Sequence, residues 1–243
     1  MNGLMQHLVV TPVLLPLAIS AAILLVDEQR RQLKRGMTLF AVLALIANAA
    51  MLIVMSAKDS VPTVYLIGNW TAPFGITLVT DKLTAIMLML TGILGLATLL
   101  YSFARWDRAG PRFHALFLLL LMGVNGAFLT GDLFNLFVFF EVMLAASYGL
   151  ALHGGGSART RVGLHYIAIN VATSLLFLIG VALLYSVTGT LNMADLAMRI
   201  PAVPREDIML LEAGAAILGI AFLVKAGMWP LSFWLTPTYA AAV

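Results

Sequence analysis

The chain contains no cysteine and few charged residues. Because none of its 243 residues is cysteine, disulfides, thiolate metal sites and iron–sulfur clusters are excluded. Only 10% of the residues are charged, whereas a soluble domain has about 25%. The formal net charge of +3 is too small to indicate a nucleic-acid partner. No pair of histidines has the spacing expected of haem or metal ligands, so we expect no haem or metal site.

Apolar residues dominate the sequence and occur in long runs. Hydrophobic residues make up 62% of the chain, and the mean hydropathy is +1.01. A helix of about 20 apolar residues crosses the roughly 30 Å of bilayer hydrocarbon. We therefore predict an all-α, polytopic membrane protein with about seven transmembrane helices, at residues 8–26, 37–57, 81–103, 113–130, 132–152, 162–187 and 208–235. The first run lacks a preceding basic region, so we interpret it as a span rather than a signal peptide.

Basic residues in the connections predict the orientation. Nine Lys and Arg residues lie in the first, third and fifth connections, and four lie on the opposite side, namely Lys58, Lys82, Arg199 and Arg205. Cytoplasmic loops carry the excess of basic residues, so we expect the N-terminus outside. Residues 57–80 and 190–207 then form two long outer segments. We expect both to be surface connectors, the first irregular or a short hairpin. A weakly amphipathic interfacial turn at Met193–Ile200 is the alternative for the start of the second.

Glu141 is an ionisable residue in the middle of the fifth predicted span. It follows Asp132 by nine residues, which is about 13.5 Å along a helix and close to the bilayer midplane. A charge at this depth costs roughly 2.5–3.5 kcal/mol. A packing role is the alternative, but Ser or Thr can form interhelical hydrogen bonds without that cost. We therefore interpret Glu141 as a proton-transfer residue.

Lys225 lies in the seventh predicted span, five residues before Pro230. Proline lacks an N–H, so a helix is expected to break there, and Gly227 loosens the same stretch. Transporters place such breaks at their ion sites. A lysine that extends its amine to the cytoplasmic interface is the alternative. We interpret Lys225 as a second proton-transfer residue, with Gly227 and Pro230 marking the helix break.

The remaining polar residues give weaker indications. His165, near the start of the sixth span, could relay protons or make an interhelical hydrogen bond. Asp81 and Asp132 open helices and are expected to act as N-cap residues, whereas Glu212 is expected at a solvated helix start. The other histidines lie near the predicted interfaces, where we expect them to be solvated: His7, His114 and His153.

Three segments resemble a known family. Residues 131–149, GDLFNLFVFFEVMLAASYG, resemble the fifth helix of the antiporter-like subunits shared by Mrp cation/proton antiporters and respiratory complex I. Val224–Leu235 resembles their broken seventh helix. Leu184–Asp195 resembles the D subunit of the Mrp type in particular. The resemblance extends over essentially the whole chain.

This resemblance implies a function and a pair of site residues. Family members pair a glutamate of the fifth helix with a lysine of the seventh, and these positions match Glu141 and Lys225. The pair forms part of a proton route, which Mrp complexes couple to sodium or potassium efflux. The implied protein is a transporter subunit in the cell (inner) membrane, not an enzyme. It needs no cofactor and works in the lipid bilayer with other membrane subunits, protons and monovalent cations as its partners.

The chain is shorter than the family pattern. Members have about 14 helices with two inverted five-helix repeats, whereas this chain ends at Val243. We therefore expect an N-terminal portion: one transmembrane domain, residues 1–243, with three leading helices in 1–111 and an incomplete first repeat in 112–243. A proton-pumping subunit of an NADH–quinone oxidoreductase or a related hydrogenase remains an alternative, as does an inactive remnant or scaffold. The coupled cation is left open.

Overall fold

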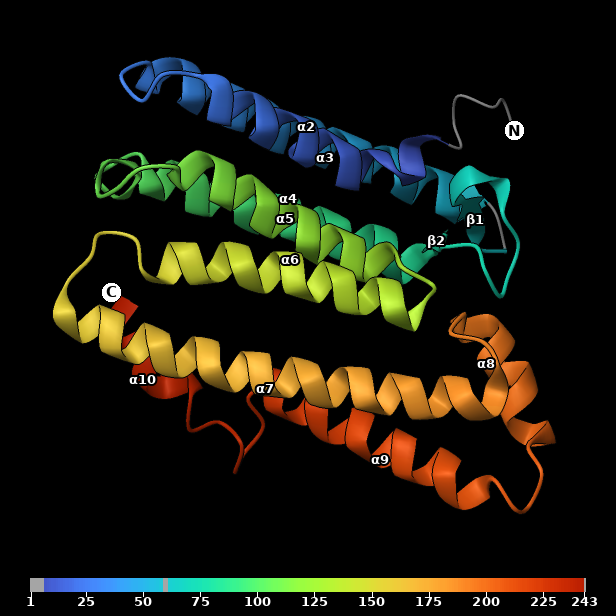
Figure 1. Ribbon diagram of the computed structural model, residues 1–243. Coiled ribbons are helices and arrows are strands. Elements are labelled where there is room, and N and C mark those ends of the chain that lie inside the picture. The colour runs from blue at the N-terminus through green and yellow to red at the C-terminus, as the bar shows by residue number, and fades with distance from the viewer. Residues whose placement is uncertain (1–6, 59–60, 243) are drawn as a thin grey trace. The chain divides into compact units, whose positions relative to one another are not determined.

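The computed structural model describes residues 7–58 and 61–242, and it is mostly helical, with 76% of residues in helices. Within these residues, seven apolar helices occupy the seven predicted runs. They are α2 (Thr11–Leu25), α3 (Arg31–Lys58), α4 (Lys82–Ser102), α5 (Phe113–Leu129), α6 (Leu133–Ala151), α7 (Ser157–Thr188) and α9 (Ile208–Lys225). Figure 1 shows them in chain order from blue to red.

Five of these helices, α3, α4, α6, α7 and α9, are long and apolar enough to cross a membrane. The other two, α2 and α5, are shorter apolar helices of 15 and 17 residues. The predicted class, a polytopic membrane protein, is therefore confirmed. The number of seven spans and the outside position of the N-terminus stay predictions.

The all-α prediction needs one correction, because residues 57–80 contain a small β-sheet. Strands β1 (Thr63–Leu66) and β2 (Thr77–Thr80) pair with each other. A bridge between Leu78 and Thr130 then ties β2 to the end of α5. A short hairpin is one of the two forms that the sequence predicts for this segment, and the β-branched residues of both strands favour it.

The chain divides into two compact units. The first contains α2–α5, the chain up to Tyr65, and residues Phe139–Gly154, which include the second part of α6. In this unit, α2 packs on α5 and α3 packs on α4. Its two buried apolar clusters centre on opposite halves of these helices, and include Val9, Leu52 and Leu129 in one, and Ile23, Leu99 and Leu118 in the other.

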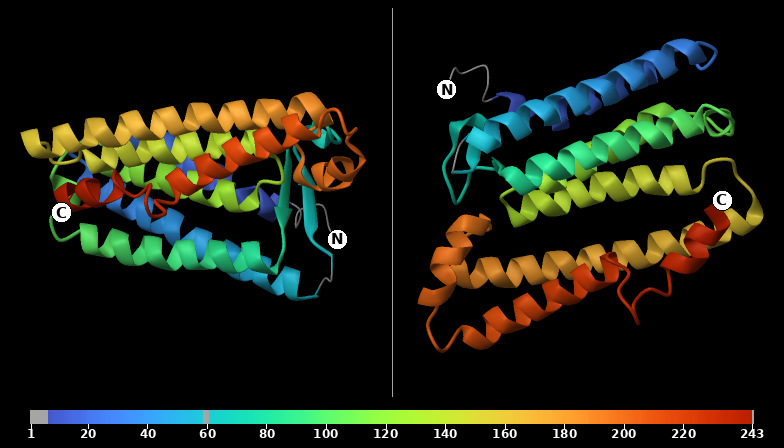
Figure 2. Two further views of the ribbon diagram at one scale, coloured as in Figure 1. Left: turned by 90° about the horizontal axis from the view of Figure 1, so that it is seen from below. Right: turned by 180° about the vertical axis from the view of Figure 1, so that it is seen from behind.

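The second unit contains the start of α6, α7, the short helix α8 (Met193–Arg199), α9, and α10 (Leu235–Ala242). Figures 1 and 2 show α7 and α9 side by side, with α10 against the N-terminal end of α7. The two long helices run antiparallel, since Ser174 meets Lys225 whereas Gly180 lies against Gly214 and Leu218.

Two aspartates begin helices as the sequence predicts. The Oδ1 atom of Asp81 accepts the backbone N–H of Thr84 at 2.7 Å. Asp132 Oδ1 accepts the backbone N–H of Asn135 at 2.9 Å. Each bond satisfies one of the N–H groups that have no partner within the first turn of a helix.

Glycines set the distance between α7 and α9. A Cβ atom at Gly180 would lie 2.9 Å from the backbone nitrogen of Leu218, and one at Gly214 would lie 2.9 Å from Leu183 Cβ. Real side chains do not approach this closely. The two backbones therefore touch only because both positions lack a side chain, which is the small-residue packing typical of membrane helices.

We predict that Gly180→Ala destabilises the protein by about 1–3 kcal/mol, because overpacking forces the two backbones apart. Gly219→Ala on α9 is the matched control, since nothing lies within 4 Å of its added methyl group. Thermal unfolding in detergent should show a lower midpoint for the first variant only. Equal midpoints for the two variants would contradict the close helix contact.

Candidate functional site

The break in the seventh predicted span begins at Lys225, so the span is not helical up to Pro230. Helix α9 ends at Lys225, and the chain is non-helical until Leu235. Gly227 adopts a φ of +63°. The N–H of Gly227 bonds the carbonyl of Val224 at 3.0 Å, and the N–H of Met228 bonds that of Leu223 at 3.1 Å. These two nested bonds form a Schellman motif, so the helix ends at the glycine, before the proline.

Trp234, at the end of the non-helical segment 226–234, contacts the end of α9. Its indole Nε1 donates to the backbone carbonyl of Val224 at 3.0 Å. The side chain is 4% exposed, and its ring stacks on Tyr166 of α7 with centroids 5.4 Å apart. The Val224 carbonyl, which already accepts the N–H of Gly227, thus gains a second donor from a side chain. Such compensation is what makes a broken helix tolerable at membrane depth.

Lys225 lies against the polar part of α7. Its Nζ donates to the hydroxyl of Ser174 at 3.0 Å. Ser174 is buried, as are Asn170 and Thr173 on the same helix. The latter two donate to backbone carbonyls one turn earlier, at 3.0 and 2.7 Å. The half-buried lysine therefore contacts the Ser174 hydroxyl. The neighbouring Asn170 and Thr173 side chains donate to backbone carbonyls of their own helix.

Aromatic pairs lie on both sides of this contact along α7. Towards the start of the helix is the Tyr166–Trp234 stack. One turn beyond Ser174 lies Phe177, which is fully buried and meets Phe222 edge-on at 5.4 Å. Phe137, at the start of α6, is 6.0 Å from the same ring. The polar stretch around Ser174 is thus bounded by apolar rings.

Glu141 lies near the middle of α6, as the ninth of its 19 residues, and is half-buried. It belongs to the first unit, whereas Lys225 belongs to the second. The part of α6 around it packs closely on α5: a Cβ at Gly126 would meet the ring of Phe139, and one at Gly123 would meet Met143. The helix that carries Glu141 is therefore held at short range by two glycines. Pairing of Glu141 with Lys225 stays a prediction.

The histidines divide differently from the sequence prediction. His7 is exposed, as predicted, but His114 and His153 are buried. His114 Nδ1 lies 3.1 Å from the Thr38 hydroxyl, and His153 Nε2 lies 2.8 Å from the carbonyl of Trp106. The segment from Ala104 to Arg112 folds over the helix ends and covers both rings, which the spacing of the sequence could not indicate.

His165 is exposed, with its ring 6.3 Å from that of Phe233 in the segment after the break. Its role as a relay stays a prediction. Glu212 is exposed at the start of α9, as predicted. Ser174, in contrast, was missed. The signal for it was present in the sequence as three polar residues, Asn170, Thr173 and Ser174, within about one turn of an apolar helix.

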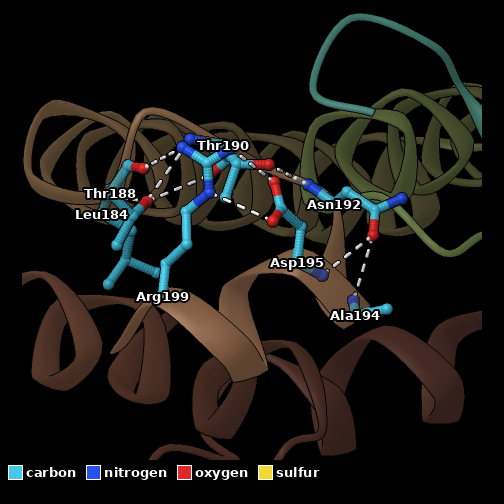
Figure 3. Close-up of polar contacts among 7 residues, drawn as sticks. All are labelled: Leu184, Thr188, Thr190, Asn192, Ala194, Asp195 and Arg199. Carbon is cyan, nitrogen blue, oxygen red and sulfur yellow. Dashed lines mark hydrogen bonds and ion pairs between the residues drawn. The ribbon is translucent and has the colours of Figure 1, made fainter. Parts of the chain in front are cut away.

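A group of polar residues, here called the polar corner, surrounds α8 (Figure 3): Thr188, Thr190, Asn192, Asp195 and Arg199. Asn192 caps this helix, because its side-chain oxygen accepts the N–H groups of Ala194 and Asp195, each at 3.1 Å. Arg199 donates to the Thr188 carbonyl at 3.0 Å and forms a two-point ion pair with Asp195 at 3.1 and 3.0 Å. The Arg199 guanidinium, followed by the Thr190 hydroxyl, lowers the pKa of Asp195.

The same corner is tied to the start of α6. Backbone bonds join Leu133 N–H to the Leu191 carbonyl at 2.9 Å, and Met193 N–H to the Gly131 carbonyl at 2.8 Å. Residues 131–133 and 191–193 therefore form a short ladder. Two of the three segments on which the family resemblance rests, 131–149 and 184–195, thus contact each other, and the contact is made by the start of the first segment, which lies in the second unit.

Known proteins are similar to this chain in sequence. Residues 130–243 match the family model described as NADH:quinone oxidoreductase/Mrp antiporter, transmembrane. The chain is 56% identical to the D subunit of a probable K⁺/H⁺ antiporter of Rhizobium meliloti, over 100% of this chain and 46% of that protein. It is 43% identical to the D subunit of a Na⁺/H⁺ antiporter of Alkalihalophilus pseudofirmus, over 97% of this chain and 47% of that protein.

A solved structure is similar as well. A chain of the Mrp complex from a Dietzia species superposes with a TM-score of 0.88 at 31% identity, covering 99% of this chain and 44% of that one. The chain thus spans about half the length of the curated relatives that it matches.

We predict that Trp234→Phe loosens the end of α9, because the Val224 carbonyl loses its indole donor. A lost hydrogen bond of this kind costs about 0.5–1.5 kcal/mol. Hydrogen exchange should become faster for the amides of residues 222–228.

Trp229→Phe is the matched control for this experiment, since that side chain is 87% exposed. Equal exchange in the two variants would show that the Trp234 bond does not hold the helix end.

Proposed function

From the membership of residues 130–243 in the NADH:quinone oxidoreductase/Mrp antiporter transmembrane family, we propose that this chain serves in a multisubunit monovalent cation/proton antiporter. The D subunits to which it is similar are named for K⁺/H⁺ and Na⁺/H⁺ exchange, so Na⁺ or K⁺ is the coupled cation. The similar structure belongs to an Mrp complex, and we infer that further membrane subunits surround this chain in the cell membrane. Residues 112–243 correspond to the first part of an antiporter repeat.

Glu141 and Lys225 carry protons in this proposal. The observation that supports it most directly is the Lys225 Nζ–Ser174 Oγ hydrogen bond of 3.0 Å at the end of a broken helix. A neutral amine can accept the hydroxyl proton of serine, whereas an ammonium donates to the serine oxygen. The hydroxyl can therefore satisfy both protonation states of Lys225 without a large movement.

The helix end adds to the suitability of Lys225. Because Gly227 turns the chain out of the helix, Lys225 is the last residue of α9. The negative end of a helix dipole stabilises a nearby cation by about 0.3–1 kcal/mol at exposed sites. Glu141 supplies the matching acid on α6, and His165 extends the route towards the start of α7.

A proton-pumping subunit of an NADH–quinone oxidoreductase is the second candidate, because the family description includes both classes. The two differ in their energy source. Antiport in this protein's complex would be driven by a proton gradient alone, whereas a redox subunit would need electron transfer from NADH. The identities of 56% and 43% to antiporter D subunits favour the antiporter.

We predict that Glu141→Gln and Lys225→Ala each lower cation-dependent proton flux at least about tenfold, a barrier increase of about 1.4 kcal/mol. The measurement uses membrane vesicles that hold the complete complex containing this chain, with a ΔpH dye and added Na⁺ or K⁺. Lys225→Arg should fail as well, because arginine keeps its proton. This variant separates proton transfer from a purely electrostatic role.

Glu212→Gln and Lys82→Ala are the controls, since both side chains are exposed at the starts of helices. They should retain normal flux. Full activity of Glu141→Gln and Lys225→Ala, at normal protein levels, would overturn the assignment of these residues.

A further inference from the structure

The first unit contains a cavity of about 280 Å³ that the proposed proton route does not use. It lies where α2 ends and where α3 and α5 begin, under the connection between α4 and α5. Its lining includes four basic residues, Arg31, Lys34, Arg108 and Arg112. Two acidic residues, Glu28 and Asp107, line it as well.

Ion pairs account for both acids and leave an excess of positive charge. Lys34 is buried, and its Nζ lies 2.8 Å from Glu28. Asp107 pairs with Arg35, which lies outside the cavity lining. In the part of the chain that the structure describes, the three cavity arginines, Arg31, Arg108 and Arg112, have no ion-pair partner. Several guanidinium groups around one cavity are suited to a phosphate, which they bind in a two-point geometry.

A buried acceptor in the same cavity needs a donor. The side chain of Asp107 is 1% exposed, and its Oδ1 atom is buried with no hydrogen-bond partner among the described residues. A buried oxygen without a partner costs about 1–3 kcal/mol. This oxygen has almost no accessible surface, so a ligand hydroxyl next to a phosphate would satisfy it only after a small shift of the cavity lining, whereas an inorganic anion with no proton would be repelled by it.

The backbone at Arg112 is also unusual. This residue precedes α5 with φ +64° and ψ +12°, the left-handed region, and its side chain makes no capping bond. For a residue with a Cβ atom, this conformation costs roughly 1–2 kcal/mol. Such strain is typical of residues that face a ligand. Here Arg112 lines the cavity without capping the helix that it precedes.

The surroundings of the cavity favour a lipid over a free anion. A second hollow of about 470 Å³ shares Glu28, Pro111 and Arg112 with the cavity, and continues along Leu24 and Leu25 at the end of α2. Leu25 is 89% exposed. Because these residues lie where apolar helices end, they are at the level of the lipid headgroups in a membrane.

We propose that this cavity binds the headgroup of an anionic phospholipid that has a free hydroxyl, such as phosphatidylglycerol. Arg31, Arg108 and Arg112 bind the phosphate, and the headgroup hydroxyl donates to Asp107 Oδ1. An acyl chain lies along Leu24 and Leu25. The site is independent of the proposed transport function, because it uses neither Glu141 nor Lys225.

The test uses the delipidated complex containing this chain, in detergent, with thermal unfolding at increasing concentrations of phosphatidylglycerol. We expect saturable stabilisation, which phosphatidylcholine with the same acyl chains does not produce. Inorganic phosphate and glycerol 3-phosphate form the two soluble arms. Stabilisation by either as strong as that by phosphatidylglycerol would overturn the lipid assignment.

The variants are Arg108→Gln and Arg112→Gly, with Arg105→Gln as the matched control because Arg105 does not line this cavity. The first two should each weaken phosphatidylglycerol binding at least tenfold, and the control should not. Glycine accepts the positive φ at position 112, so Arg112→Gly should not lower the midpoint without lipid, even if Arg108→Gln unfolds. Unchanged phosphatidylglycerol binding in Arg112→Gly would overturn the proposal.

Discussion

A backbone carbonyl inside an apolar segment needs a partner from the protein, since hydrocarbon offers none. This requirement shapes the chain around Lys225. The helix stops there, and Gly227 adopts a left-handed backbone conformation. The N–H groups of Gly227 and Met228 then satisfy the carbonyls of Val224 and Leu223 through two nested bonds. Trp234 then returns to add its indole N–H. A lysine can therefore end a helix in an apolar environment while the carbonyls of Leu223 and Val224 keep hydrogen-bond partners.

Helix α7 provides the surface on which this arrangement is built. Gly180 allows α9 to approach, Ser174 meets the lysine, and Tyr166 supports the returning tryptophan. These three contacts are made by one helix at positions eight and six residues apart, about two turns in each case. They use different chemistry, respectively close backbone packing, a hydrogen bond and aromatic stacking. The position of Lys225 is consequently determined by α7 as much as by its own helix.

Much of the fold follows from the apolar runs, and the exceptions have local causes. All seven predicted runs contain a helix, but α3 begins at Arg31 rather than near residue 37. Its first turns are polar. Because hydropathy marks only the apolar part of a helix, it cannot show that the helix extends beyond that part. The seventh span ends early because the conformation of Gly227, rather than Pro230, stops it. Both differences lie at helix ends, where propensity and periodicity are least informative.

The candidate site was predictable only in part. Ionisable residues in apolar runs indicated Glu141 and Lys225, since their cost in hydrocarbon is visible in sequence alone. Ser174 required the register between two helices, which Gly180 and Gly214 determine in three dimensions. The burial of His114 and His153 depends on how the Ala104–Arg112 connection folds. Composition cannot specify such a connection, because its polar residues are compatible with either water or a covered site.

The glycine contact also has a mechanical consequence. Where two backbones touch, one helix cannot slide along the other without bringing a side chain into the gap, but it can tilt about the contact. Lys225 lies eleven residues from Gly214, about 16 Å along the helix at 1.5 Å per residue. A tilt of about 5° would therefore move the amine by about 1.4 Å, while the helices at Gly214 stay in place. That displacement is enough to break a hydrogen bond of 3.0 Å to Ser174. A small tilt of α9 about Gly180 and Gly214 would thus be enough to separate Lys225 from Ser174.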